Sequence, residues 1–193
     1  MIRWRLDTEA MTGVSEHGHT VALRPFLGAM GMPPAAPGLH AGWTPRIYGG
    51  NMDCKELVAG STLYLAVPGG LVSVGDGYAV QGDGEVGGSA LECPMERVDL
   101  HYVLHDGLRI GAPRAHTPAG RVTLGFGETL EAAAAMALGE MLDLIEDAFA
   151  VPHAEALALA SVAVDVRITQ LVNGVVGVHA VLPHGAVREE RGI

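Results

Sequence analysis

The densest group of chemically active side chains lies between residues 75 and 85. Asp76, Asp83 and Glu85 each stand next to a glycine in the string Gly-Asp-Gly-Tyr-Ala-Val-Gln-Gly-Asp-Gly-Glu. Glycine permits sharp turns, so the three carboxylates can converge, and converging carboxylates repel unless a cation or a proton lies among them. A hard divalent cation accepts such oxygen ligands, whereas zinc more often takes some His or Cys as well. The pattern indicates an acidic pocket; the other interpretation is a glycine-rich surface turn with solvated acids.

A second polar group occupies the string Gly-Gly-Asn-Met-Asp at residues 49–53. Asn51 could donate a hydrogen bond to a carbonyl, and Asp53 could bind a metal or act as a general base. Taken alone, the string also fits an Asx-type cap that opens a turn, because Asn and Asp bond readily to their own backbone.

Other function classes find little support in the composition. The formal net charge of −10 argues against nucleic acid, which needs clustered Lys and Arg. No apolar run approaches the ~20 residues of a membrane span. The chain lacks the serine elbow and the phosphate loop of common enzyme classes. With two cysteines, Cys54 and Cys93, and no apolar signal-type start, we expect a cytoplasmic protein.

The elements that would position these side chains are short strands in the first part of the chain. The 27 glycines, many of them between residues 49 and 88, indicate tight turns around a shaped site. Alternating apolar residues predict strands over 61–67, 71–74 and 98–104, with a hairpin turn at 105–107 and a return strand over 108–110. Residues 85–92 are also expected to be strand-like, and the Pro- and Gly-rich stretch 25–38 is expected to be irregular.

The period of the apolar pattern then changes. Spacing typical of one helix face predicts a helix over 130–148, and Pro152 is well placed to open a second helix. From about residue 164 the period returns to two, and Asn173-Gly174 predicts a hairpin turn between strands 164–172 and 175–182. We therefore expect an α+β, predominantly β fold: a β-sandwich-like front half, two helices and a closing C-terminal β-hairpin. Residues 1–193 are expected to form a single unit, with a possible subdivision into a β-rich part, 1–125, and a part of helices and hairpin, 126–193.

Several strings, in their order along the chain, resemble the acetamidase/formamidase family. They are Pro25-Phe-Leu-Gly-Ala-Met-Gly, Asn51-Met-Asp, Gly60-Ser-Thr-Leu-Tyr-Leu, Val67-Pro-Gly-Gly-Leu, Gly75-Asp-Gly-Tyr-Ala-Val-Gln-Gly-Asp-Gly-Glu-Val and Leu159-Ala-Ser-Val-Ala-Val-Asp-Val-Arg-Ile-Thr-Gln-Leu-Val-Asn. The resemblance covers about residues 23–182, and Gln-Gly-Asp-Gly-Glu-Val is its most specific part.

This resemblance implies an amidohydrolase that cleaves formamide or acetamide to ammonia and the carboxylic acid. It implies a divalent metal ion, with zinc or calcium favoured, and a homodimer or a higher homo-oligomer. We expect Asp53 and Asp76 to be metal ligands, and Glu85 or Asp83 to act as general base and to protonate the leaving ammonia. Asn51 would orient the amide. The remaining substrate-binding residues would be Gln81 and Tyr78.

The chain departs from the family in three ways. Tyr78 stands where members usually carry His, Gly87 stands where they carry Cys, and the family's N-terminal portion, with a further His, is expected to be missing. The alternative to an active amidase is therefore a non-catalytic relative that acts as a binding or structural module, or a fragment completed by another chain.

Overall fold

The structure is a computed structural model, and it describes residues 2–188. Two helices and twelve strands follow one another along this part of the chain. The elements are β1 Trp4–Asp7, β2 Thr12–Ser15, β3 Thr20–Ala22, β4 Phe26–Gly31, β5 Gly49–Asn51, β6 Thr62–Tyr64, β7 Ser73–Val80, β8 Leu91–Glu92, β9 Arg114–Thr117, β10 Gly120–Gly127, α1 Leu130–Phe149, α2 His153–Ala163, β11 Asp165–Gln170 and β12 Val176–Pro183.

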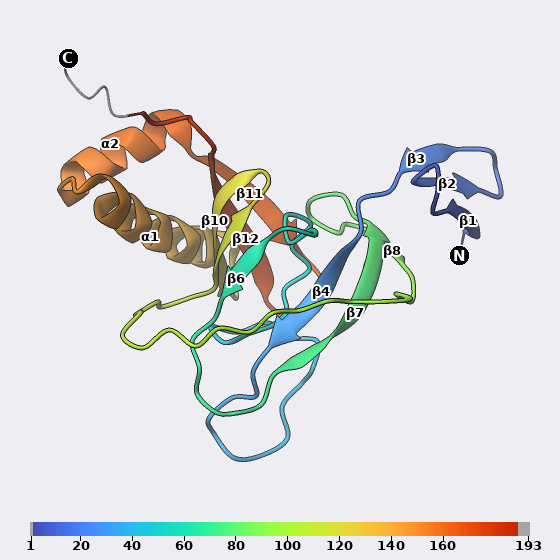
Figure 1. Ribbon diagram of the computed structural model, residues 1–193, viewed down its shortest axis with the longest axis horizontal. Helices are drawn as coiled ribbons and strands as arrows, with labels where there is room; N and C mark the ends of the chain where they lie inside the picture. The colour runs from blue at the N-terminus through green and yellow to red at the C-terminus, as the bar shows by residue number, and fades with distance from the viewer. Residues whose placement is uncertain (1, 189–193) are drawn as a thin grey trace.

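The strands form three sheets, and all their paired strands are antiparallel. The N-terminal sheet has the order β1-β2-β3, and it stands at one end of the molecule in Figure 1. A five-stranded sheet has the order β11-β12-β10-β9-β6, and a four-stranded sheet has the order β5-β4-β7-β8. The expected α+β, predominantly β fold is confirmed.

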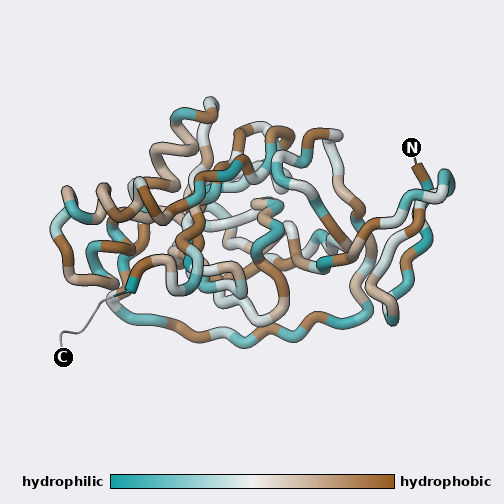
Figure 2. Tube along the Cα trace, turned by 90° about the horizontal axis from the view of Figure 1, so that it is seen from above, coloured by the Kyte–Doolittle hydropathy of each residue, from teal (hydrophilic) through white to brown (hydrophobic). Residues whose placement is uncertain are grey.

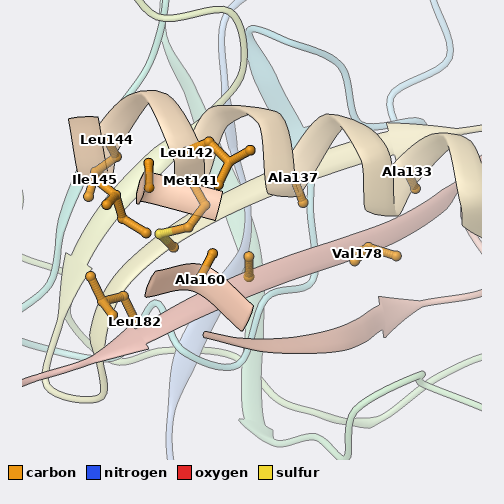
Figure 3. Close-up of a cluster of buried hydrophobic side chains, with 11 residues drawn as sticks. Ala133, Ala137, Met141, Leu142, Leu144, Ile145, Ala160, Val178 and Leu182 are labelled. Atoms are coloured by element: carbon orange, nitrogen blue, oxygen red, sulfur yellow. The ribbon is translucent and has the colours of Figure 1, made fainter. Parts of the chain in front are cut away.

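Both helices pack on one face of the five-stranded sheet. The apolar face of α1 is aligned on β10 and β12, as Figure 3 shows for Ala137, Met141 and Ile145 above Val178 and Leu182. The helix begins after Thr129, whose side chain accepts a hydrogen bond from the N–H of Ala132, a typical N-cap. Side chains alternate along β12, so its remaining residues face the other side of the sheet.

A second core lies on that opposite face. Met52, Cys54 and Leu57, which follow β5, pack there with Val181 and with four residues of β9 and β10: Ala115, Val122, Leu124 and Phe126. This core joins the segment after β5 to the five-stranded sheet. The segment that follows β7 also reaches this sheet, because Gly84 pairs with Gln170 through a parallel bridge. The N–H of Gly84 donates to the carbonyl of Thr169 at 3.1 Å.

Most of the predicted elements are present, with changes at their ends. The predicted helix over 130–148 is α1, the second helix begins directly after Pro152, and the C-terminal hairpin is formed by β11 and β12. The hairpin connection is longer than the predicted turn, since residues 171–175 join the two strands. Neither helix in the described part of the chain has the length and apolar character that crossing a membrane requires.

Three predictions about the first part of the chain were wrong. Residues 98–104 and 108–110 form no strands but an extended segment, which Figure 2 shows along one edge of the molecule with hydrophobic and hydrophilic residues alternating. Residues 85–92 are mainly turn, bend and irregular backbone, and only Leu91–Glu92 is strand. Conversely, the stretch expected to be irregular contains β4. Gly28 lets β4 pass close to β7, because a Cβ there would lie 2.4 Å from the Tyr78 ring.

Candidate active site

Asp53 lies at the centre of the candidate site. The residues on either side of it, Met52 and Cys54, are buried in the second core. The N–H groups of Met52 and Asp53 both donate to the carbonyl of Gly28, at 2.9 and 3.1 Å. This path gives Asp53 a left-handed φ of 50°, and its side chain is only 1% exposed. A Cβ on Gly28 would lie 2.5 Å from Oδ1 of Asp53, so glycine is required for this carboxylate to fit.

Carboxamide side chains hold Asp53 at both ends. Asn51 Nδ2 donates to Oδ2 of Asp53 at 3.0 Å, and Asn173 Nδ2 donates to the same oxygen. The backbone carbonyl of Asp53 accepts from Gln81 Nε2 at 2.7 Å. Donors of this kind favour the ionised form of a carboxyl group. Oδ2 and the backbone carbonyl of Asp53 are therefore both held by side-chain donors.

Glu85 is the second buried acid of the site. It is 5% exposed and also has a left-handed φ, of 45°. Burial, followed by the charge of Asp53, raises the pKa of Glu85 to about 7, although a hydrogen bond from Tyr78 opposes the rise. A hydrogen bond with Asp53 acts in the same direction as burial. At neutral pH this carboxyl group is therefore close to the midpoint of its titration, as suits an acid or base.

Each of the two carboxyl groups has one buried oxygen without a hydrogen-bond donor among the described residues. These oxygens are Oδ1 of Asp53 and Oε2 of Glu85. An unpaired buried oxygen costs free energy, and two neighbouring carboxylates also repel. One proton held between the two groups removes both penalties. A further buried oxygen, Gln81 Oε1, has no partner among the described residues and can accept a hydrogen bond from a ligand.

Tyr78 is a buried side chain that forms a hydrogen bond with Glu85. Its ring is 2% exposed and stacks on Phe26, with the ring centroids 4.7 Å apart. Its hydroxyl donates to Glu85 Oε1 at 3.1 Å. Burial, followed by the charges of Asp53 and Glu85, raises the pKa of Tyr78 well above its ordinary value. The phenol therefore keeps its proton and acts as a fixed donor.

The other two predicted acids do not join this pair. Asp76 is exposed on β7, with a φ of 61°, and partial burial together with the charge of Asp53 raises its pKa. Asp83 forms an ion pair with Lys55, at 2.7 Å between Oδ2 and Nζ, on a partly exposed part of the turn. Of the seven predicted site residues, the structure thus brings together Asn51, Asp53, Tyr78, Gln81 and Glu85, and it places Asp76 and Asp83 nearer the surface.

The side chains present do not fit a divalent-metal site of their own. Within residues 2–188, no group of three or more His, Cys, Asp and Glu side chains is placed to hold a metal ion. Asp53 and Glu85 offer two carboxylates, while the predicted ligand Asp76 is exposed. Zinc or calcium at this site stays a prediction, which metal analysis of the purified protein tests.

A hollow of about 330 Å³ lies elsewhere, on the helix side of the five-stranded sheet. Tyr64, Arg114 and Arg121 form part of its wall together with Leu144 of α1. None of the predicted site residues lines it, so it is separate from the acidic pair.

Sequence reasoning missed one residue of the site, Asn173. The pair Asn173-Gly174 indicates a turn, which is correct, but the side chain of Asn173 reaches across to Asp53. Composition held a signal: the chain contains only two asparagines, Asn51 and Asn173, and both donate to the same carboxylate oxygen.

The chain is similar in sequence and in fold to known proteins. A sequence model of the Acetamidase/Formamidase family matches residues 38–109, a range that includes all seven predicted site residues. Among curated proteins, no significant match is found.

Solved acetamidases have the same fold over nearly the whole chain. An acetamidase from Bacillus halodurans is 28% identical, with a TM-score of 0.78, over 93% of this chain and 60% of that one. An acetamidase from Yersinia enterocolitica is 26% identical, with a TM-score of 0.82, over 96% of this chain and 56% of that one. A predicted acetamidase/formamidase from Thermoanaerobacter tengcongensis is 25% identical, with a TM-score of 0.78, over 92% of this chain and 59% of that one.

The chain therefore spans about 60% of the length of the solved acetamidases that it matches. The family model and the solved structures both point to acetamidases. The resemblance to the acetamidase/formamidase family is therefore confirmed.

Proposed function

We propose that this chain is an amide hydrolase that cleaves a short-chain amide, formamide or acetamide, to ammonia and the carboxylate. The observation that carries the proposal is the buried pair of Asp53 and Glu85, each with one oxygen unpaired among the described residues, and with the pKa of Glu85 raised to about 7. Family and structural neighbours support amide hydrolysis in general. The particular substrate and the mechanism are inferred from the residues of this chain.

The two carboxyl groups differ in role because their surroundings differ. Oδ2 of Asp53 accepts hydrogen bonds from Asn51 and Asn173, and we assign Asp53 as the base. Glu85, with its raised pKa, keeps the proton, so it is the acid. Aspartic proteases cleave amide bonds with two carboxyl groups that share one proton, which is the same chemical division of labour.

Hydrolysis then proceeds by two proton transfers. Asp53 takes a proton from a water molecule as its oxygen attacks the amide carbonyl, and a carbon–oxygen bond forms. Glu85 gives its proton to the amide nitrogen, the carbon–nitrogen bond breaks, and ammonia leaves. The proton on Asp53 returns to the pair, which restores the starting state. Gln81 Oε1, which has no partner within residues 2–188, is available to accept from the substrate NH2 group.

Tyr78 replaces the family's imidazole with a group that cannot act as a base here. Its hydroxyl donates to Glu85 Oε1 and so fixes the orientation of the acid. The divalent metal expected from the resemblance is not needed for any of these steps, and none is assigned to it.

The test is to incubate the full chain with formamide and with acetamide and to measure ammonia and carboxylate together. We expect equal amounts of the two products, and release that declines as the pH rises above about 7, because the pair then loses its shared proton. No release from any short amide, with zinc, manganese or calcium added or without them, would contradict the proposal.

That negative result would favour the second candidate, a non-catalytic binding or structural module. Two observations support this alternative. The chain spans about 60% of the solved acetamidases, and the acidic pair is deeply buried, with Asp53 1% and Glu85 5% exposed. A fragment completed by another chain is the related alternative, and activity that appears only on adding a second polypeptide would identify it.

A further inference from the structure

The hollow on the helix side of the five-stranded sheet is lined by side chains that the acidic pair does not use. Its volume of about 330 Å³ lies in the range of small-molecule pockets, ~300–1,000 Å³. Strand pairing accounts for its polar wall. His116 of β9 lies directly opposite Arg121 of β10, and Arg114 of β9 lies opposite Tyr64 of β6. Because side chains alternate along a strand, these four lie on one face of the sheet.

An ion pair holds one wall of the hollow in place. Arg114 Nε donates to Oε2 of Glu140 in α1 at 2.8 Å, and both side chains are mostly buried. The other carboxylate oxygen, Glu140 Oε1, accepts from the N–H of Gly111 at 3.1 Å. Glu140 thereby ties the segment before Gly111 to the helix. The apolar lining comes from this segment and from α1: Leu108, Ile110, Leu144 and Ala148.

Arg121 brings a positive charge to this hollow. Among residues 2–188, no Asp or Glu side chain forms an ion pair with it. Its guanidinium carbon lies 5.9 Å from the centroid of the Phe149 ring. Burial, followed by the charges of Arg121 and His184, lowers the pKa of His116, so its imidazole is neutral at pH 7 and has one N–H to donate. The Tyr64 ring packs edge-on against His116, with centroids 5.7 Å apart.

We propose that this hollow is a second binding site, which takes an organic monocarboxylate with an apolar body. Arg121 pairs with the carboxylate, for which a guanidinium offers two parallel N–H donors. His116 donates to the same group, and the Tyr64 ring and the apolar lining receive the body. Asp147 also lines the hollow, at the exposed end of α1. Its charge repels a second negative charge, so the site favours a monoanion over a phosphate ester.

The experiment measures the binding of three probes to the full chain by ligand-observed NMR, in which the signals of a bound probe broaden. Phenylacetate has the carboxylate and an apolar body. Phenylethanol has a similar body without the charge, and phenyl phosphate carries a second negative charge. We expect phenylacetate to bind about tenfold or more tightly than phenylethanol, because hydrogen bonds to a charged group are the stronger ones. Phenyl phosphate should bind more weakly than phenylacetate.

Two arginine variants locate the site. Arg121→Gln removes the charge from the hollow and should weaken phenylacetate binding by about tenfold or more, while phenylethanol binding stays the same. Arg109→Gln is the matched control, because Arg109 is exposed on the neighbouring segment and does not line the hollow. It should leave the binding of phenylacetate unchanged. If Arg121→Gln fails to fold by circular dichroism, Ala148→Phe replaces it, since a ring at this exposed position of α1 fills the hollow and should abolish binding.

The outcomes either support this site or overturn it. No broadening of any probe overturns the site, and equal binding of phenylacetate and phenylethanol, or tighter binding of phenyl phosphate, overturns the class of ligand. Equal losses in Arg121→Gln and Arg109→Gln would indicate general charge attraction and overturn the hollow as the location. Glu85→Gln should bind phenylacetate as wild type does; a loss there would place the carboxylate at the acidic pair instead. Binding at the hollow by a protein that releases no ammonia supports this proposal while amide hydrolysis fails.

Discussion

At the scale of single residues, backbone strain and charge coincide in the acidic site. Among the described residues other than glycine, five have a left-handed φ, and three of these are Asp53, Asp76 and Glu85. Such conformations cost of order 1–3 kcal/mol each and persist where the surroundings impose them. Hydrogen bonds to Gly28 impose the conformation of Asp53. The strain places a carboxylate against Tyr78 and Gly28, where an unstrained path would not take it.

The raised pKa of Glu85 makes a prediction about stability. The ordinary pKa is 4.5 and the folded value about 7, so the folded state binds this proton more strongly than the unfolded chain does. The stability from this group is full below its unfolded pKa and is lost as the pH rises through the folded value. We expect the free energy of unfolding to fall by on the order of 2 kcal/mol from this group between about pH 4.5 and pH 8.

Glu85→Gln resembles the protonated acid and should remove this pH dependence. Chemical denaturation of both proteins at several pH values in that range measures it. An equally steep decline in the Glu85→Gln variant would contradict the assignment of the shared proton.

The sequence predicted residues better than it predicted their partners. Asn51, Asp53, Tyr78, Gln81 and Glu85 were recognised from strings that are continuous in the chain. Their convergence depends on the left-handed φ values of Asp53 and Glu85, which residue types alone do not determine. Asn173 was missed because it is 120 positions from Asp53. The two residues meet because the segment after β5 packs on the five-stranded sheet, which contains β11 and β12.

At the scale of elements, a glycine in β10, Gly125, permits α1 and β10 to pack closely against each other. A Cβ on Gly125 would lie 2.1 Å from the carbonyl of Ala133 and 2.5 Å from the N–H nitrogen of Ala137, so the helix backbone itself would have to move. Gly125→Ala should therefore destabilise the protein by about 1–3 kcal/mol or more.

Gly139→Ala is the matched variant, because Gly139 lies on the exposed side of α1 with nothing within 4 Å of an added Cβ. It should stabilise the protein by up to about 1 kcal/mol, since alanine favours helix. Thermal and denaturant unfolding measure both. If the two variants changed stability equally, the close packing of α1 on β10 would be wrong.

Elements with a long regular pattern were predictable, and those that depend on a partner were not. The helix pattern of α1 and the alternation of β11 and β12 give the correct elements because each buries one face on the same sheet. Residues 98–104 have the same alternation but form no strand, since in the described structure no neighbouring strand pairs with them. Alternation predicts an extended backbone, whereas a strand also needs a partner.

At the scale of the whole molecule, this extended segment leaves apolar surface uncovered. Val98, Leu100, Tyr102, Val103 and Leu104 are between 43% and 73% exposed. Contiguous apolar surface of this kind marks interaction sites in soluble proteins. The predicted homo-oligomer would cover it. We expect size-exclusion chromatography with light scattering to give at least the mass of a dimer.

Leu104→Glu should shift that mass toward the monomer, because a charge would be buried in the contact. Val162→Glu is the control, since Val162 is 83% exposed on α2 and lies apart from the segment; it should leave the mass unchanged. A wild-type protein that is monomeric at micromolar concentration would contradict the oligomer prediction.

Both buried acids follow strands of the four-stranded sheet: Asp53 lies in the segment after β5, and Glu85 lies in the turn after β7. We expect this pair, and not the acids nearer the surface, to carry the chemistry. Ammonia release from formamide by Glu85→Gln and by Asp83→Asn distinguishes the two. Glu85→Gln should be inactive yet folded, and Asp83→Asn, which loses the ion pair with Lys55, should retain activity within a few-fold of wild type. Activity that survives in Glu85→Gln and is lost in Asp83→Asn would contradict it.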